Sequence, residues 1–167
     1  MRDNKMDQHP LYKEVLHHAW FCRDKCSAFR GRQAILNRVK NFLSSNALLK
    51  PLVVYGASGS GKTSIMAVIV SNAKEWLGKT SVCVFRFLGT SPDTSNIVVS
   101  LTSIIRQIHE VYDLGTLKEE IAEDFSQLVR HFHDLLQSPE ITSDKPLLLV
   151  IDSIDQLTPS YNAHLMN

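Results

Sequence analysis

The fold is decided by a single stretch of sequence, Gly56-Ala57-Ser58-Gly59-Ser60-Gly61-Lys62-Thr63. It satisfies the pattern G-x-x-x-x-G-K-[ST] and stands between an apolar, β-branched run at residues 51–55 and a helical pattern at residues 65–77. A strand, this loop and a helix, in that order, form the context in which the backbone wraps phosphate oxygens. The glycines let backbone N–H groups point inward, and the helix adds the positive end of its dipole. The alternative, a glycine-rich turn with an exposed lysine, is disfavoured by this context.

The end of this loop carries the polar groups that a bound nucleotide needs. Lys62 supplies a positive charge for the β- and γ-phosphates, so it is our first candidate catalytic residue. The hydroxyl of Thr63 is an oxygen ligand of the kind that Mg²⁺ takes. The predicted nucleotide contacts are Gly56, Ala57, Ser58, Gly59, Ser60, Gly61, Lys62, Thr63 and Ser64. The loop therefore predicts a bound nucleoside di- or triphosphate together with Mg²⁺.

A second metal ligand is predicted about ninety residues downstream. Residues 148–151 are four apolar residues in a row, and Asp152 follows them directly. Parallel strands place such an end at the edge of the sheet that carries the ligand, beside the phosphate loop. Taken alone, the pattern also fits an ordinary strand followed by an Asp-Ser turn. With the loop upstream we favour Mg²⁺ binding by Asp152, and Asp155 lies close enough in sequence to face the same site.

The remaining pattern predicts strands that alternate with helices. Further strands are expected at residues 81–88 and 147–151, and helices at residues 93–111 and 117–137, the last with Thr116 as N-cap and Glu119 as its capping-box partner. Amphipathic helices are expected at residues 11–29 and again after Gly31. This alternation predicts an α/β domain with a parallel sheet, preceded by two helices.

Composition excludes several other classes of protein. The chain has 167 residues, 44% of them hydrophobic, and 18 basic residues against 17 acidic ones give a formal net charge of +1. A near-neutral chain does not coat nucleic acid through bulk charge, and no apolar run approaches the length of a membrane span. Cys22, Cys26 and Cys83 cannot all pair, so we expect reduced thiols and a cytoplasmic protein.

Three segments together resemble the signalling P-loop ATPases of the STAND class, in their NACHT form. They are the loop, the opening Phe29-Arg30-Gly31-Arg32, and the run Asp152-Ser153-Ile154-Asp155-Gln156. A fourth, residues 86–92, is similar to the segment after the second strand of NACHT proteins joined to WD repeats. The resemblance implies a three-layer sandwich, with a helical segment at residues 1–28 and a partial NACHT-type domain at residues 29–167. It also implies that Gly31 and Arg32 help to hold the adenine end of the nucleotide.

The sequence departs from the family pattern at the positions that activate water. Ser153 stands where many related ATPases have glutamate, and Gln156 stands where NACHT proteins have one. Glutamine cannot act as a base at neutral pH, which leaves Asp155 as the nearby carboxylate for that role. Because phosphoryl transfer depends on an oriented nucleophile, we expect nucleotide binding with slow or absent hydrolysis.

A second departure concerns the sheet. The resemblance implies a further strand between the runs at residues 51–55 and 147–151, and residues 161–167 favour the start of a helix instead. The two runs are therefore not expected to pair with each other. Unpaired buried backbone groups are costly, so we expect a C-terminally truncated sheet of marginal or partner-dependent stability.

Several isolated residues favour structural roles over chemical ones. His18, Cys22 and Cys26 follow each other at helical spacing, which suits core cysteines beside a partly exposed histidine better than a zinc site. His131 and His133 are expected at the surface. Arg86 is expected as a solvent residue near a strand end, with an arginine finger as the alternative.

Three functions remain after this argument. The first is an ATP- or ADP-binding module of a signalling switch that controls oligomerisation, through self-association or protein partners, as the resemblance implies. The second is a non-enzymatic interaction fragment that binds nucleotide weakly. The third is a small-molecule P-loop kinase, which is disfavoured because 55 residues precede the loop and no arginine-bearing lid is evident downstream.

Overall fold

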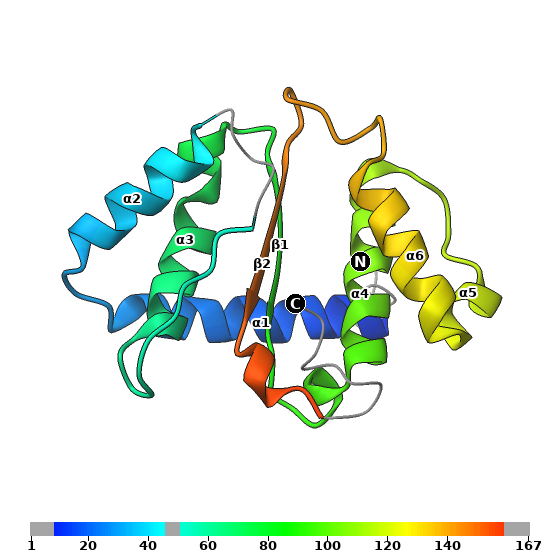
Figure 1. The fold of residues 1–167 in the computed structure, drawn as a ribbon, viewed down its shortest axis with the longest axis horizontal. Coiled ribbons are helices and arrows are strands. Elements are labelled where there is room, and N and C mark those ends of the chain that lie inside the picture. Colours follow the sequence, from blue (N-terminus) through cyan, green and yellow to red (C-terminus); the bar gives the residue numbers. More distant parts are fainter. Residues whose placement is uncertain (1–8, 46–50, 159–167) are drawn as a thin grey trace, which may run out of the picture.

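The computed structural model describes residues 9–45 and 51–158, and Figure 1 shows their arrangement. The helices and strands follow one another as α1 (Pro10–Ser27), α2 (Gln33–Leu43), α3 (Lys62–Leu77), β1 (Val82–Phe87), η2 (Asp93–Ser95), α4 (Ile97–Tyr112), α5 (Glu119–Glu123), α6 (Phe125–Leu136), β2 (Leu147–Asp152) and η3 (Ile154–Gln156). The strands lie in the middle, with α2 and α3 on one side and α4, α5 and α6 on the other. This three-layer α/β arrangement confirms the predicted fold class.

The described sheet consists of two parallel strands. β1 pairs with β2 in a register that sets Val82 beside Leu147 and Phe87 beside Asp152. Because β2 is an apolar run, its alternate side chains enter the cores on both faces of the sheet. Leu147, Leu149 and Ile151 pack toward α4 and α6, whereas Leu148 and Val150 pack toward α2 and α3. The two strands therefore join the two helical layers into one body.

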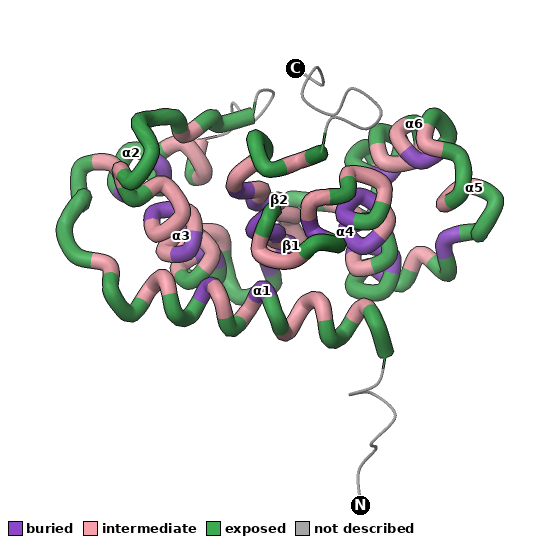
Figure 2. The backbone as a smooth tube through the Cα atoms, turned by 90° about the horizontal axis from the view of Figure 1, so that it is seen from below, coloured by how far each residue is buried: buried purple, intermediate pink, exposed green. Residues whose placement is uncertain are grey.

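Each helical layer contributes the apolar stripe that its sequence predicts. The larger core cluster consists of Val84, Leu101, Ile104, Ile105, Ile108, Tyr112, Leu117, Leu128 and Leu135. The second cluster consists of Leu36, Val39, Ile65, Ile69 and Val150. Figure 2 shows buried stretches along α3 and α4, the helices that lie on either side of the strands. Burial of these side chains is the main stabilising term of the domain.

Helix α1 covers the edge of β1 that faces away from β2 (Figures 1 and 2). His18 is fully buried there, and its Nδ1 accepts a hydrogen bond of 3.2 Å from the backbone N–H of Phe87. Arg86 is also buried, and its Nε donates to Glu14 Oε1 at 3.1 Å. The predictions of a partly exposed His18 and a solvent Arg86 were therefore wrong. Both side chains instead tie α1 to an otherwise open strand edge.

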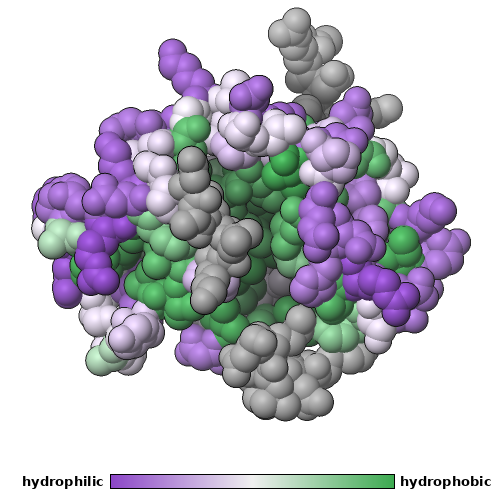
Figure 3. All heavy atoms as spheres, turned by 45° about the horizontal axis from the view of Figure 1, so that its top comes forward, coloured by the Kyte–Doolittle hydropathy of each residue, from purple (hydrophilic) through white to green (hydrophobic). Residues whose placement is uncertain are grey.

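The strand predicted at residues 51–55 does not form. In the structure this run has no regular secondary structure, and 42% of Leu52, 70% of Val53 and 90% of Tyr55 is exposed. β2 pairs with β1 and not with this run, as expected. An apolar, β-branched run becomes a strand only where a neighbouring strand satisfies its backbone, and none of the described strands lies against it. Figure 3 shows apolar side chains gathered in a hollow between the two helical layers.

The helix predicted at residues 117–137 is interrupted. Asp124 ends α5 and caps α6, its carboxylate accepting hydrogen bonds from the N–H groups of Ser126 and Gln127. Thr116 is not the N-cap that the sequence predicted, because α5 begins at Glu119 and its N-cap residue is Lys118. The helix expected at residues 93–111 likewise divides into η2 and α4, with Asn96 as the cap of α4. Local capping groups here prevail over a continuous apolar period.

Two negative findings apply to the described ranges, 9–45 and 51–158. No helix there is long and apolar enough to cross a membrane. No group of three or more His, Cys, Asp and Glu side chains there is placed to hold a metal ion. Residues 161–167, for which a helix start was considered, lie outside the described residues.

Candidate nucleotide-binding site

The phosphate loop has the backbone geometry that its glycines allow. Gly59 and Gly61 adopt left-handed conformations with φ of 73° and 88°, and a Cβ atom built on either would meet nothing within 4 Å. The N–H of Ser60 donates to the carbonyl of Ala57 at 3.2 Å, which closes a turn inside the loop. Gly61 is the N-cap of α3, so the helix dipole begins at the end of the loop.

Lys62 closes this loop from inside. Its Nζ donates to the carbonyl oxygens of Gly56 at 2.9 Å and of Ala57 at 3.0 Å. These are neutral acceptors from the loop itself, and among the described residues Lys62 forms no ion pair with a carboxylate. An anion that enters the loop therefore gains a cation that no acidic side chain neutralises.

Arg32 reaches the same loop from a distant part of the sequence. Gly31 and Arg32 both have positive φ, 79° and 60°, and Arg32 is the N-cap residue of α2. This turn directs the Arg32 Nη2 to the carbonyl oxygen of Ser60, at 3.2 Å. The structure thus brings together the two segments from which nucleotide contacts were predicted. Arg32 is exposed, and its guanidinium remains accessible from solvent.

The acidic residues lie at the same end of the molecule. Figure 1 shows the loop leading into α3 and the C-terminal ends of β1 and β2 at its lower side. Asp152 is the last residue of β2 and is 7% exposed, and its Oδ2 accepts a hydrogen bond of 3.2 Å from the hydroxyl of Ser153. Thr63 and Ser64 stand in the first turn of α3.

Asp155 differs from Asp152 in its surroundings. It belongs to η3 and is exposed, and its Oδ2 accepts a hydrogen bond of 3.1 Å from Nε2 of Gln156. Among the described residues, no hydrogen bond joins it to the phosphate loop. An exposed carboxylate held by a neutral amide is a weak candidate for orienting water.

These residues fit a magnesium nucleotide. The loop offers backbone donors, an ammonium group without an acidic partner and open space at Gly59 and Gly61, all of which suit phosphate. The Thr63 hydroxyl and the Asp152 carboxylate are oxygen ligands of the type Mg²⁺ prefers. When bound, the metal would neutralise phosphate charge, while Lys62 and Arg32 act from the protein side.

Sequence reasoning missed the residues that hold the acidic loop. The N–H of Leu88 donates to the carbonyl of Asp152 at 3.2 Å, and the N–H of Thr158 donates to that of Ser95 at 2.9 Å. Gly89 lies directly against Gln156. The sequence contained one signal for this contact, the glycine in Leu88-Gly89-Thr90 after a predicted strand. An isolated glycine at such a place indicates that another segment packs closely against the backbone.

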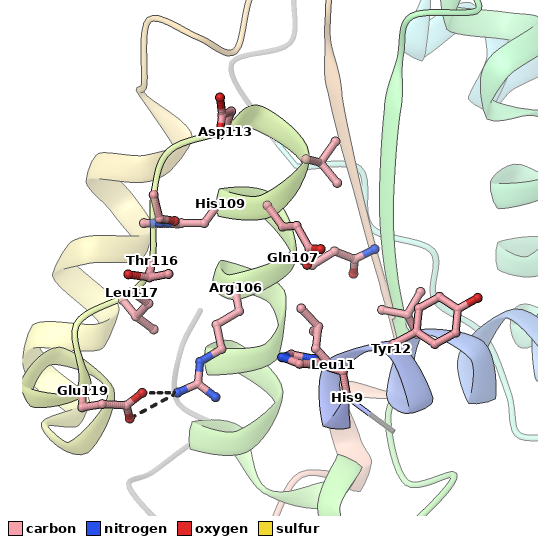
Figure 4. A pocket seen from close by; sticks show the side chains of 14 residues that line it. His9, Leu11, Tyr12, Arg106, Gln107, His109, Asp113, Thr116, Leu117 and Glu119 are labelled. Atoms are coloured by element: carbon pink, nitrogen blue, oxygen red, sulfur yellow. Dashed lines mark hydrogen bonds and ion pairs between the residues drawn. The ribbon is translucent and has the colours of Figure 1, made fainter. Parts of the chain in front are cut away.

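A separate hollow of about 1040 Å³ lies away from this site, between the start of α1 and the second half of α4 (Figure 4). His9, Tyr12 and Gln107 contribute to its wall, and an ion pair between Arg106 and Glu119 spans 3.0 Å at one side. None of the predicted nucleotide or metal ligands lines it. Apolar, polar and charged side chains occur together in its lining, and this mixture does not indicate a particular class of ligand.

The fold and the site together define a P-loop nucleotide-binding domain of the ATPase class. Comparison with known proteins places it more closely: a family model described as "AAA ATPase domain" matches residues 28–165. The chain belongs to that family. No solved structure matches it.

The similar curated proteins confirm the resemblance to NACHT and WD-repeat proteins. The chain is 32% identical over 149 residues to the human "NACHT domain- and WD repeat-containing protein 1", and the match covers 88% of this chain and 10% of that protein. It is 29% identical over 161 residues to the human "NACHT and WD repeat domain-containing protein 2", covering 92% of this chain and 9% of that protein. The mouse counterpart of the first is also 32% identical. The chain spans about a tenth of the length of these relatives.

Proposed function

We propose that this chain is the ATP- or ADP-binding module of a STAND-type signalling switch that controls oligomerisation. The observation that carries the proposal is that the side chains of Lys62 and Arg32 both donate hydrogen bonds to the phosphate loop. Arg32 donates to Ser60 and Lys62 to Gly56 and Ala57, so both cations lie on one loop. The relatives, whose names combine a NACHT domain with WD repeats, support a larger assembly around this module.

Slow or absent hydrolysis is the second part of the proposal. Hydrolysis requires a group that orients water, and Asp155 is exposed and bound to a neutral amide. Ser153 and Gln156, which stand at the two positions where related proteins have glutamate, carry no charge. Lys62 and Asp155 are the proposed catalytic residues. Because Asp155 is poorly placed to orient water, we expect bound nucleotide to be hydrolysed slowly or not at all. A nucleotide that is bound but hardly hydrolysed acts by stabilising one of two conformations of the protein.

A weakly binding interaction fragment is the second candidate. The observation that favours it is the exposure of Leu52, Val53 and Tyr55 immediately before the phosphate loop. In this form the loop is not anchored by a strand, which lowers the population of the binding-competent conformation and hence the apparent affinity. Protein partners would then supply the function, and nucleotide would bind poorly.

The site of action is proposed to be the cytoplasm. The three cysteines are free, with Cys22 buried and Cys26 and Cys83 partly buried. Burial raises the pKa of the Cys83 thiol to about 12. Unpaired thiols are usual in a reducing compartment.

The test of the switch is the state of assembly in the presence of different nucleotides. Sedimentation velocity of the full chain would be measured with ADP, with ATP and with a non-hydrolysable ATP analogue, each with Mg²⁺, alongside release of phosphate from ATP. We expect a different distribution of assembly states with the analogue than with ADP, and phosphate release far below one turnover per second. The variant Lys62→Ala should lose the nucleotide dependence, whereas Lys79→Ala, an exposed lysine beyond the end of α3, should keep it.

One set of results would contradict the switch. If the distribution is identical with all three nucleotides although each binds, the module carries nucleotide without switching. Fast turnover stimulated by a metabolite would point to the small-molecule kinase instead.

A further inference from the structure

The loop that carries both candidate acids rests on a glycine from the other strand. Gly89 follows β1 and has a φ of 73°, in the left-handed region. A Cβ atom built on Gly89 would lie 2.7 Å from Cβ and 2.9 Å from Cγ of Gln156. Contacts this short do not occur between real side chains, so any residue larger than glycine must push Gln156 away. Both the backbone conformation and the space therefore require glycine at this position.

Gln156 in turn holds the acidic segment in its shape. Its backbone N–H donates to the carbonyl of Ser153 at 2.9 Å, which closes η3. Its side-chain Nε2 donates to Oδ2 of Asp155 at 3.1 Å. Ser153 itself has a φ of 61°, so the chain turns sharply between Asp152 and η3. The position of Gln156 thus sets where the carboxylate of Asp155 points.

Hydrogen bonds on both sides of Gly89 complete the attachment. Leu88 donates from its backbone to the carbonyl of Asp152, the residue at the end of β2. Thr158 donates to the carbonyl of Ser95 through its backbone N–H at 2.9 Å and its hydroxyl at 3.2 Å. The segment at residues 88–95 therefore holds the acidic segment at its beginning and at its end. Gly89 lies between these two attachments.

We propose that Gly89 is a positioning residue for magnesium-dependent nucleotide binding. Its missing side chain lets Gln156 pack closely, and Gln156 fixes Asp155 and the turn after Asp152. A side chain at position 89 displaces the acidic segment and weakens the contribution of Mg²⁺, while the phosphate loop at residues 56–63 is untouched. The inference rests on the proposed function, because it concerns the metal side of the same site.

The test compares nucleotide affinity with and without the metal. Binding of a fluorescent ADP to the full chain is titrated in Mg²⁺ and in EDTA, for the unchanged chain, for Gly89→Ala and for Gly115→Ala. Gly115 is a matched control, because its φ is 75° and a Cβ built there meets nothing within 4 Å. Both substitutions impose a similar backbone strain, and only the first displaces Gln156.

We expect Mg²⁺ to tighten binding to the unchanged chain and to Gly115→Ala by the same factor. In Gly89→Ala this factor should fall roughly tenfold or more, as is usual when a residue that orients a metal ligand is lost. The affinity in EDTA should stay within about twofold, because the phosphate loop is intact. An unchanged Mg²⁺ factor in Gly89→Ala overturns the inference. Absence of binding to the unchanged chain overturns the proposed function as well.

Two variants at Gln156 keep the test decisive if Gly89→Ala folds poorly. Gln156→Ala keeps the Cβ atom of residue 156 that packs against Gly89, but it removes the amide that binds Asp155. Because Asp155 is then no longer held in place, the Mg²⁺ factor should also fall. Gln156→Gly removes the clashing atoms, so adding Gly89→Ala to it should lower the unfolding midpoint only as much as Gly115→Ala does. A full Mg²⁺ factor in Gln156→Ala, or additive effects in the double variant, would contradict the positioning role.

Discussion

The ion pair between the partly exposed Glu14 and the buried Arg86 allows a quantitative test of how α1 is attached. Arg86 is 1% exposed, and its guanidinium donates to Glu14 Oε1 at 3.1 Å, to Gln107 Oε1 at 2.8 Å and to Ser103 Oγ at 2.7 Å. Glu14 is the only carboxylate among these acceptors. Burial opposes its ionisation, but His18, Ser103 and the Arg86 charge outweigh burial and lower the pKa of Glu14.

The variant Glu14→Gln keeps the shape of the side chain and removes its charge. Loss of one partner from a fully buried ion pair costs about 3–5 kcal/mol. Arg86 keeps its neutral acceptors, and the Glu14 side chain is 22% exposed, so we expect about 2–3 kcal/mol. With a urea m-value of about 2 kcal/mol/M, the midpoint should fall by about 1–1.5 M.

Urea unfolding of the full chain, followed by far-UV circular dichroism, measures this change. Glu75→Gln on the exposed side of α3 is the control and should stay within about 0.5 kcal/mol of the unchanged chain. The double variant Glu14→Gln with Arg86→Met should lose less than the sum of the single variants, because no uncompensated charge remains. If Glu14→Gln is as stable as the control, the ion pair does not hold α1 and the reasoning is refuted.

Three further predictions concern α4 and α6. A hydrogen bond of 2.8 Å joins Nε2 of His131 to Nε2 of His109, and burial and then the His109 charge lower the pKa of His131. Stability should therefore fall as pH drops below about 6.5, and His131→Phe should make this fall shallower in urea titrations. A residual slope is expected from buried His18, whose pKa is also lowered by burial, and an unchanged slope would refute the role of the pair. Leu128→Ala should cost about 2–5 kcal/mol by creating a cavity, measured as a lower urea midpoint, and a loss under 1 kcal/mol would mean that α6 is loosely packed. Asn96→Ala should cost about 1 kcal/mol in the same assay, because its side chain caps α4 at Val98 and Val99, while Asn96→Asp should retain most of that stability.

The sequence predicted those parts of the fold whose signals are local. The phosphate loop, the α3 helix after it and the apolar runs of β1 and β2 were all recognisable, and the structure has them within a few residues of the expected bounds. The parallel pairing of β1 with β2 was predicted from the alternation of strands and helices. In each case a short motif or a regular apolar period was enough.

The errors arose where a distant segment decides the outcome. Residues 51–55 have strand-forming side chains, but β-structure requires a neighbour and no described strand supplies one. Arg86 alternates with apolar residues as a solvent-facing strand residue would, yet α1 covers that edge and supplies Glu14. A single sequence does not reveal which helix will cover which edge.

The same limit applied to the candidate site. Lys62 and the loop were evident from one motif, whereas the contact between Gly89 and Gln156 joins residues 67 positions apart in the chain. The glycine was visible, but its neighbour was not. The resemblance supplied the expectation that Arg32 belongs to the site, and the structure places it on the loop at Ser60.

The most direct test of the central claim is the equilibrium affinity of the full chain for ADP in Mg²⁺, compared with that of Lys62→Ala. Removing one charge-assisted phosphate contact should cost about 1.5–3 kcal/mol, which is roughly a ten- to more than hundredfold rise in Kd. We predict saturable binding to the unchanged chain and a rise of that size in the variant. Equal affinity in both, or no binding to either, would contradict the assignment of this loop as a nucleotide site.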